Sequence, residues 1–459
     1  MLEIETMTGA DDLERMHFVE QELLKRWPES RLEPTLERIA YLCDALGSPQ
    51  LSYPTIHITG TNGKTTTSRM IDAILYQLGY RTGRFTSPHL EQMTERIAIN
   101  GEPIPPEGFV AAYDDIALYL EMVDSRMPHR LSFFEAITAL AFVAFAEYPV
   151  DVGVIEVGMG GEWDATNVAN GTVNVITPIG FDHMEYLGDT LTKIATTKSG
   201  IIKPSSITVL AAQEMEAAKV LLERCIEVES APLREGIEFS LTTREIALGG
   251  QVISIDGVNG KYSEIFLPLH GAHQAHNAAV AVAAVEAFVG DKSLDEEVLR
   301  EAFALVRSPG RLEVVHRDPT IILDAAHNPH GMRSLIDTLH HEFDFTDRIA
   351  VFAPMGDKDV DGMLEMMDST FDTIVLTRST SQRALDVDRL SELARRRFGE
   401  DRILAAPTLP EGIEKAIEIA HRRNLSESGS AAVIVTGSVV TVGEARVLLR
   451  HRKERRERR

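Results

Sequence analysis

The stretch TIHITGTNGKTTTSRM, residues 55–70, combines residue types that can bind a chain of phosphates. Gly60 and Gly63 allow the backbone to turn its N–H groups inward, and a helix that begins near Lys64 would point its positive end at the same anion. The Lys64 ammonium would reach the β- and γ-phosphates, and the Thr65 hydroxyl would face Mg²⁺. We therefore predict a loop that binds Mg-ATP through Thr61, Asn62, Gly63, Lys64 and Thr65.

The loop departs from the usual P-loop spacing, which places a glycine where this chain has Ile58. A plain glycine-rich turn between a strand and a helix is the alternative interpretation. The GK-threonine sequence has a β-branched run before it and helical periodicity after it, and this context favours nucleotide binding.

Two further side chains are candidates for the same site. Glu156 interrupts the apolar strand VGVIEV near its C-terminal end, and a buried carboxylate is costly unless it is paired or bound to a metal. His183 in GFDHMEY follows another predicted strand and would reach the same edge of the sheet. From the pattern alone, a lone histidine after a strand is more often structural, and Ser87 before Pro88 is adequately explained as a turn residue.

The C-terminal third holds a second group of polar residues. In TIILDAAHNPHGM, Asn328 and Pro329 are explained as the start of a helix, whereas Asp324 and His327 have no such structural reason. Both would lie at the C-terminal edge of a strand and face the first part of the chain. The loops APMGDKD and TRSTSQRAL are expected at the same edge.

The elements that position these residues follow an α/β pattern. Near-continuous apolar runs such as TIHIT, VDVGVIEVG, TIILD and AAVIVTG suit parallel strands that are buried on both faces, with crossover helices between them. Residues 240–268 instead predict antiparallel hairpins, and an Ala-rich helix follows from His273 to about Val289. Ser-Pro-Gly near residue 310 indicates a linker. We predict a parallel-sheet P-loop ATPase domain over residues 1–309, with a short helical lead, and a smaller Rossmann-like α/β domain over residues 310–459.

Composition excludes several classes of protein. The chain of 459 residues carries a net charge of −24, which argues against nucleic acid or an anionic membrane as a general partner. The basic end RHRKERRERR is interpreted as a solvated, frayed helix end. Only two cysteines occur, in no metal or redox spacing, and the acidic N-terminus does not resemble a signal peptide. We expect a cytoplasmic protein with neither a membrane span nor a disulfide.

The motifs together resemble a known family. GTNGKT is the form of the phosphate loop in the Mur ligase superfamily, whose members join a carboxylate to an amine with ATP. TSPHLEQMTERIAING, LSFFEAITALAF, EVGMGGEWDATN, GFDHMEYLG, KSGIIKP, HQAHNAA, SPGRLE and DAAHNP occur in the order and spacing of folylpolyglutamate synthase/dihydrofolate synthase. The resemblance extends from about residue 35 to the C-terminal helix.

The resemblance implies a role for each matching residue. It assigns Ser87, Glu156 and His183 to Mg²⁺, with Thr65 added from the general P-loop argument. It implies that Lys198 carries a carbamate that holds a second Mg²⁺. Asn277 would contact adenine, Arg311 the phosphates and Asp324 the nucleotide, while His327 would help to orient the acyl-phosphate or the incoming glutamate. The pteroate or folate moiety would contact Ser132, Phe133, Phe134, Glu135, Trp163, Asp164 and Ala165.

Three departures from the family pattern are visible. The family usually has GKGS where this chain has GKTTT, EKAGI where it has TKSGI, and DGAHNP where it has DAAHNP. The first makes the loop resemble that of a muramyl-peptide ligase. The second removes a carboxylate beside Lys198. None removes a residue to which we assign chemistry.

The resemblance implies an ATP-dependent ligase that adds L-glutamate to dihydropteroate and to tetrahydrofolates, through an acyl-phosphate, and that acts as a monomer on small molecules. A muramyl-peptide ligase is one alternative, although about fifty residues before the phosphate loop are too few for its separate UDP-binding domain. The other alternative is a P-loop NTPase that joins nothing.

Overall fold

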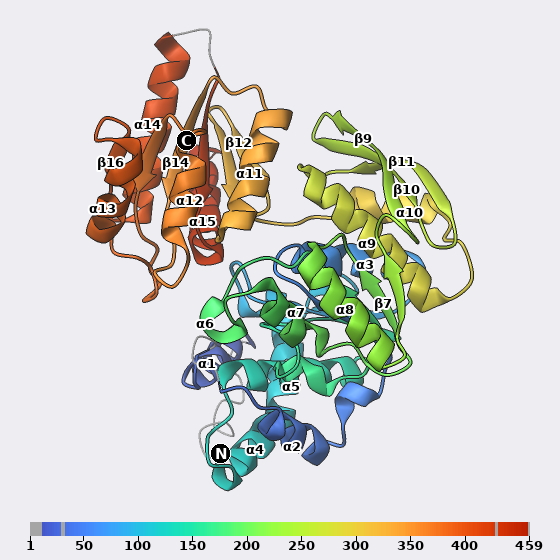
Figure 1. The fold of residues 1–459 in the computed structure, drawn as a ribbon. Helices are drawn as coiled ribbons and strands as arrows, with labels where there is room; N and C mark the ends of the chain where they lie inside the picture. Colours follow the sequence, from blue (N-terminus) through green and yellow to red (C-terminus); the bar gives the residue numbers. More distant parts are fainter. Residues whose placement is uncertain (1–11, 29–32, 427–429, 458–459) are drawn as a thin grey trace.

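The computed structural model describes residues 12–28, 33–426 and 430–457, which form three sheets (Figure 1). An eight-stranded sheet and a three-stranded sheet belong to the N-terminal part of the chain, which we call the first lobe. A six-stranded sheet belongs to the C-terminal part, the second lobe. Among the described residues, no helix has both the length and the apolar character that crossing a bilayer requires.

The eight-stranded sheet has the order β4-β3-β2-β5-β1-β6-β7-β8 and places β1 between β5 and β6. All neighbours are parallel except the pairs β2–β3 and β3–β4. Both faces of the central strands are buried, as their apolar runs predict. The strands are β1 (Thr55–Thr59), β2 (Thr82–Phe85), β3 (Ile97–Ile99), β4 (Glu102–Pro103), β5 (Val152–Glu156), β6 (Gly171–Ile176), β7 (Ile207–Leu210) and β8 (Ala231–Arg234).

Helices cover both faces of this sheet. On one face α3 packs against α9 and α10, and on the other α5 packs against α4 and α2. The helices of the first lobe are α1 (Asp12–Leu24), α2 (Glu37–Ala45), α3 (Lys64–Gln77), α4 (Pro106–Arg126), α5 (Phe133–Glu147), α6 (Met184–Leu187), α7 (Leu191–Ser199), α8 (Met215–Glu227), α9 (Ala272–Val289) and α10 (Glu296–Leu305), with the 3-10 turns η1 (Pro49–Leu51), η2 (Met93–Arg96) and η3 (Ala165–Val168).

The expected hairpins form an antiparallel sheet of their own in the order β11-β10-β9. Its strands are β9 (Ser240–Ala247), β10 (Gly250–Asp256) and β11 (Lys261–Leu267). The buried face of this sheet packs on α9 and α10, so the hairpins extend the core of the first lobe.

The six-stranded sheet has the order β12-β13-β17-β14-β15-β16, in which only β12 is antiparallel to its neighbour. Helices α11 to α13 cover one face, and α14 and α15 cover the other. The bounds are β12 (Glu313–Arg317), β13 (Thr320–Asp324), α11 (Pro329–Glu342), β14 (Asp347–Phe352), α12 (Val360–Met367), β15 (Thr373–Leu376), α13 (Val387–Phe398), β16 (Ile403–Ala405), α14 (Leu409–Ser426), β17 (Ala431–Thr436) and α15 (Val439–Glu457). The predicted α/β class with two parallel-sheet units is confirmed.

Candidate active site

The phosphate loop connects β1 to α3. Gly63 precedes the helix with a φ of 89°, a left-handed conformation that favours glycine. The Lys64 ammonium folds back over the loop and donates to the carbonyl oxygens of Gly60 at 3.1 Å and of Thr61 at 3.2 Å. The lysine is therefore held over the turn where the phosphates of a nucleotide would bind.

Helix α9 closes the loop from the side. A Cβ atom on Gly63 would lie 2.7 Å from Oδ1 of Asn277, so the backbone of the loop and this amide are in direct contact. Asn277 is buried, and its Nδ2 donates to Gln274 Oε1 at 3.0 Å. The sequence places Asn277 on the face of α9 that includes His273, and both residues line the same cavity.

Glu156 ends β5 beside the start of α3. Its Oε1 accepts a hydrogen bond from the Thr65 hydroxyl at 2.9 Å, whereas its Oε2 is buried without a partner among the described residues. Burial raises the pKa of Glu156 to about 7, against the opposing effect of Lys64. A buried carboxylate oxygen beside a threonine hydroxyl fits Mg²⁺, which prefers hard oxygen ligands.

The structure holds Lys198 at the same loop. Its ammonium is buried and donates to Gly60 O at 2.7 Å, the carbonyl to which Lys64 also donates. Burial and the nearby charge of Lys64 lower the pKa of Lys198 to about 7. A substantial part of this amine is therefore uncharged at neutral pH.

His183 is the residue that precedes α6, and its ring faces Lys358, which the sequence did not indicate as a site residue. Lys358 Nζ donates to Asp182 Oδ1 at 2.6 Å and to His183 Nε2 at 3.2 Å. The Lys358 ammonium thus stands at the lone pair that His183 would offer to a metal. Burial lowers the pKa of His183 to about 3, so the ring is neutral and able to bind a cation.

The second lobe contributes Asp324 and Arg311. The Asp324 carboxylate accepts the backbone N–H groups of Leu312 and Ala326, both at 2.9 Å, and burial raises its pKa. Asp324 therefore fixes the linker next to Arg311. His327 donates from Nδ1 to Ala325 O at 2.9 Å, and its Nε2 lies 3.4 Å from Asp182 Oδ2.

These groups surround a cavity of about 200 Å³, which we call the phosphate-loop cavity. Every residue that the sequence assigned to nucleotide, metal or catalysis lies on its wall, namely Thr61, Asn62, Gly63, Lys64, Thr65, Ser87, Glu156, His183, Lys198, Asn277, Arg311, Asp324 and His327. The described residues contain no group of three His, Cys, Asp or Glu at metal-binding distances. A metal here would therefore depend on the hydroxyl groups of Thr65 and Ser87 as well.

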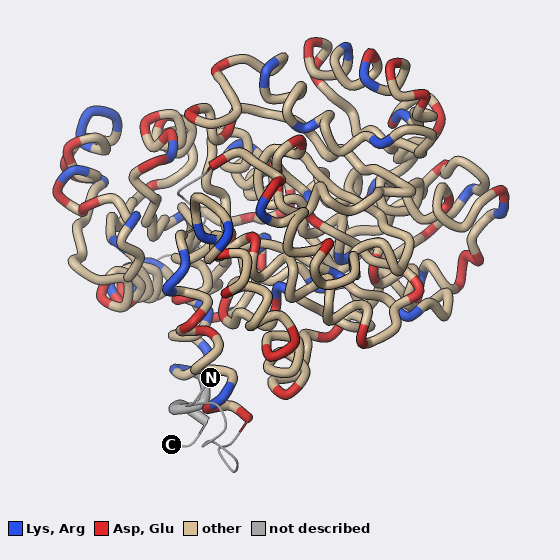
Figure 2. Tube along the Cα trace, turned by 90° about the horizontal axis from the view of Figure 1, so that it is seen from below, with Lys and Arg blue, Asp and Glu red and all other residues tan. Residues whose placement is uncertain are grey.

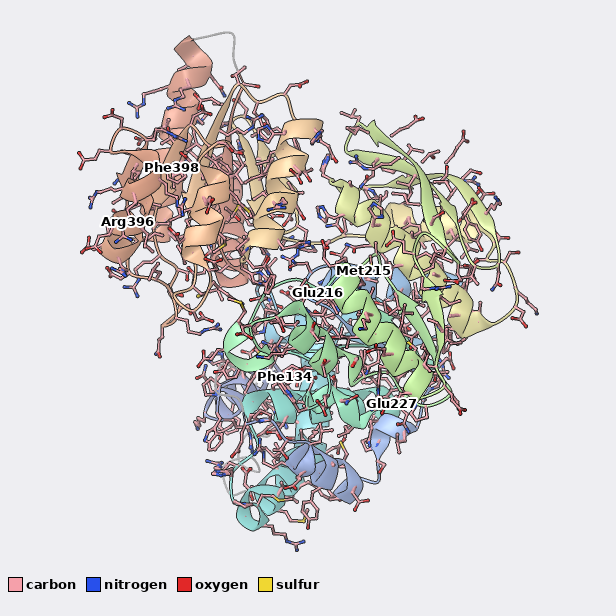
Figure 3. All side chains as sticks on the ribbon, in the orientation of Figure 1. Phe134, Met215, Glu216, Glu227, Arg396 and Phe398 are labelled. Atoms are coloured by element: carbon pink, nitrogen blue, oxygen red, sulfur yellow. The ribbon has the colours of Figure 1, made fainter. Side chains whose placement is uncertain are left out.

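A second cavity of about 680 Å³, the aromatic cavity, adjoins the first and shares Ser87, His183 and His327 with it. Six of the residues predicted to contact pteroate line it: Ser132, Phe134, Glu135, Trp163, Asp164 and Ala165. Figure 3 shows Phe134 within the first lobe, on α5.

Phe133 differs from its neighbour. It is buried in the core that α4 and α5 share, with the Arg96 guanidinium 5.0 Å from its ring centre, and it is not among the residues that line the aromatic cavity. Consecutive residues of a helix point about 100° apart, and here Phe133 points into the core while Phe134 lines the cavity.

Ser132 and Glu135 have a structural role that the sequence analysis did not mention. Ser132 Oγ accepts from Glu135 N at 3.1 Å, and Glu135 Oε2 accepts from Ser132 N at 2.8 Å, which is a capping box at the start of α5. The Arg38 guanidinium pairs with Glu135 at 3.0 Å, and Trp27 and Arg38 also line the aromatic cavity. The spacing S-x-x-E could have identified the cap, whereas nothing local identifies Arg38.

Comparison with known proteins agrees with this geometry. Residues 58–285 match the Mur ligase middle domain and residues 310–439 match the Mur ligase glutamate ligase domain, so the fold is that of a Mur-type ligase. A curated relative, the dihydrofolate synthase/folylpolyglutamate synthase of Mycobacterium tuberculosis, is 47% identical over 95% of this chain and 94% of its own length. The chain belongs to the dihydrofolate synthase/folylpolyglutamate synthase family.

Solved structures support this assignment. Folylpolyglutamate synthase of M. tuberculosis in complex with ADP superposes with a TM-score of 0.92 at 47% identity, covering 96% of this chain and 99% of that one. E. coli FolC in complex with DHPP and ADP superposes with a TM-score of 0.83 at 26% identity, covering 97% of this chain and 99% of that one.

Proposed function

We propose that this protein is an ATP-dependent ligase that joins L-glutamate to dihydropteroate and, through γ-linkages, to tetrahydrofolates, with release of ADP and phosphate. The observation that carries the proposal is the common wall of the two cavities. Ser87, His183 and His327 border both, so a carboxylate at the end of an acceptor in the aromatic cavity would meet the phosphate loop. The M. tuberculosis relative is named for the same two activities.

Lys64, Arg311 and the start of α3 would hold the triphosphate of ATP, and Asn277 with Asp324 would hold the nucleoside side. Mg²⁺ would bind at Thr65, Ser87, Glu156 and His183, and when bound it would neutralise charge on the phosphates and the acceptor carboxylate. The partnerless oxygen of Glu156 supports this assignment.

The chemistry follows from the weakness of a carboxylate as an acylating agent. An oxygen of the acceptor carboxylate attacks the γ-phosphorus, the bond to the ADP oxygen breaks, and an acyl-phosphate forms. The α-amine of glutamate, after loss of its ammonium proton to solvent, attacks the acyl carbon. The C–N bond forms, the C–O bond to phosphate breaks, and the second amine proton leaves with the products. Lys64 and Arg311 are placed to balance the charge that moves in the first step.

His327 suits the second step as a hydrogen-bond donor. Its Nδ1 faces Ala325 O and its Nε2 faces Asp182 Oδ2, so both ring nitrogens face oxygen acceptors. Because His327 lines both cavities, we assign it to orienting the acyl-phosphate or the incoming glutamate.

Lys198 would carry a carbamate, and the carbamate would hold a second Mg²⁺. Only an uncharged amine reacts with CO₂, and a pKa of about 7 leaves a large uncharged fraction at neutral pH. Protein incubated with ¹³C-bicarbonate should show a carbamate carbon signal by NMR that Lys198→Arg lacks. The same signal in both proteins would contradict the assignment.

The chain is divided into two domains, and its partners are small molecules. The unit boundary at residues 309/310 is supported by the second family match, which begins at residue 310. In Figure 2 acidic and basic residues are interspersed along the chain, which supports small molecules rather than a polyanion as partners. We place the enzyme in the cytoplasm as a monomer.

The test is a panel of acceptors with Mg-ATP and L-glutamate, read by product mass and ADP release. Dihydropteroate and tetrahydrofolate should each gain one glutamate per ADP, and ADP release should require both acceptor and glutamate. Lys64→Met should abolish both products, because the γ-phosphate loses its cation. Turnover of a UDP-muramyl acceptor alone, or ADP release without any acceptor, would overturn the proposal in favour of the two alternatives.

A further inference from the structure

Asp182 lies between the two lobes: it belongs to the first lobe and binds side chains of the second. Its Oδ1 accepts from Lys358 Nζ at 2.6 Å, and its Oδ2 accepts from Asn328 Nδ2 at 3.1 Å and faces His327 Nε2 at 3.4 Å. Asp182 belongs to the first lobe, in the segment between β6 and α6. The other three residues belong to the second lobe.

The pair Asp182–Lys358 is well shielded from water. The side chain of Asp182 is 9% exposed and that of Lys358 is 8% exposed. Lys358 Nζ faces Oδ1 of Asp182 at 2.6 Å, and His327 Nε2 faces Oδ2 at 3.4 Å. A buried carboxylate is costly without such partners, so removing one of them should disturb the others.

The contacts come from separate loops of the second lobe. Lys358 lies between β14 and α12, whereas His327 and Asn328 lie between β13 and α11. A single carboxylate thus fixes two loops of the second lobe against the rim of the phosphate-loop cavity. His327 and Lys358 also line the aromatic cavity, where the acceptor carboxylate would meet glutamate.

We propose that Asp182 is a positioning residue for the capture of the amine. It fixes Lys358 and His327 over the acyl carbon after the lobes close, and this inference rests on the proposed ligase function. Asp182 does not need to touch a substrate, because both of its oxygens are already occupied by side chains of the second lobe. Of the groups assigned to phosphoryl transfer, Lys64, Thr65 and Glu156 show no hydrogen bond to Asp182 among the described residues, and His183 contacts it by a hydrogen bond from its backbone N–H to Oδ1 at 2.8 Å.

Asp182→Asn tests the proposal because it keeps the shape and removes the charge. An amide can still accept from Lys358, but its NH₂ group would then face the donors Asn328 Nδ2 and His327 Nε2. Hydroxylamine provides the readout for the first half-reaction, since it traps an acyl-phosphate as a hydroxamate without glutamate. Formation of the glutamyl product reports both halves.

In Asp182→Asn we expect the KM for glutamate to rise by about tenfold or more, while hydroxamate formation stays within about threefold of the unchanged protein. Lys358→Met breaks the same pair from the other lobe and should give the same split. The double variant should be no worse than the more severe single variant, because both substitutions remove one interaction.

Glu342→Gln is the matched control. Glu342 is also a buried carboxylate of an interlobe cluster, 1% exposed, and it contacts Arg244 and His270, neither of which lines either of the two cavities. Its substitution should leave the ratio of amide to hydroxamate formation unchanged. A parallel fall of both products in Asp182→Asn would overturn the inference, because Asp182 would then serve the nucleotide side. Failure of the unchanged protein to form any glutamyl product would instead contradict the proposed function itself.

Discussion

The environment of Glu156 supports our proposal that this site binds a cation. The carboxylate ends an apolar strand, accepts one hydroxyl and leaves its second oxygen without a partner among the described residues. Burial raises its pKa from 4.5 to about 7, so below neutral pH the folded protein retains a proton that the unfolded chain has already released. A bound cation would reverse this preference by favouring the ionised form.

Glu156→Gln should therefore change how stability depends on pH. The favourable contribution of the protonated carboxyl is complete below about pH 4.5 and is lost as the pH rises through about 7, by up to roughly 3 kcal/mol. The glutamine variant should lack this fall. Urea unfolding of the ligand-free protein between pH 4.5 and 8 measures both slopes, and parallel curves for the two proteins would contradict the assignment.

A site residue could be predicted from the sequence where it differs in type from the residues immediately around it. Lys64 and Thr65 follow two glycines within one turn, and Glu156 is an acid within an apolar strand, so each stands out from its neighbours. Asp182 and Lys358 were missed because they are 176 residues apart and meet only when the lobes pack. Phe133 and Phe134 are equivalent as sequence, and only the orientation of α5 separates the buried ring from the cavity ring.

At the scale of elements, the phosphate loop depends on two properties of Gly63, its backbone conformation and its close contact with Asn277. Its φ of 89° is left-handed, and an added Cβ would lie 2.7 Å from Asn277 Oδ1. Gly79, at the other end of α3, has a φ of 91° with nothing within 4 Å of an added Cβ. Both glycines have a left-handed backbone conformation, but only Gly63 lies in close contact with another residue, Asn277.

Gly63→Ala and Gly79→Ala can therefore be compared directly. Both should lose about 1 kcal/mol of stability through the backbone conformation. Only Gly63→Ala should also raise the KM for ATP, by about tenfold or more, because Asn277 must move away from the loop. Chemical denaturation and initial-rate kinetics measure the two effects, and an equal rise in KM for both variants would show that the contact with Asn277 is unimportant.

Most elements were predictable because buried parallel strands leave an unbroken apolar run. TIHIT corresponds to β1, TIILD to β13, and the Ala-rich segment to α9, which begins at Ala272. The edge strands β8, β12 and β16 were not predicted, since a strand with one neighbour needs less apolar surface. Such strands are specified by the sheet they join.

At the scale of the whole molecule, three clusters of charged side chains among the described residues join the lobes. Asp182 binds Lys358 beside the cavities, Glu342 of α11 binds Arg244 of β9, and Glu91 binds Arg446 and Arg450 of α15. The sequence predicted two units and a linker, but it carried no signal for these pairings, because each joins charges that would look like ordinary surface residues. Arg450, the first residue of the basic end, is exposed as expected and also pairs with Glu91.

The C-terminal helix does more than cover a sheet. Arg446 binds Glu91 and Glu313 at once, and the carbonyl oxygen of Leu90 lies so close to Gly443 that a side chain at this position would collide with it. Leu90 and Glu91, which closely follow Ser87, are thus held against α15, the last helix of the chain. A truncation that removes Arg450 leaves the contact between Arg446 and Glu91 in place. A truncation that also removes Arg446 would free the segment that carries Ser87 from α15.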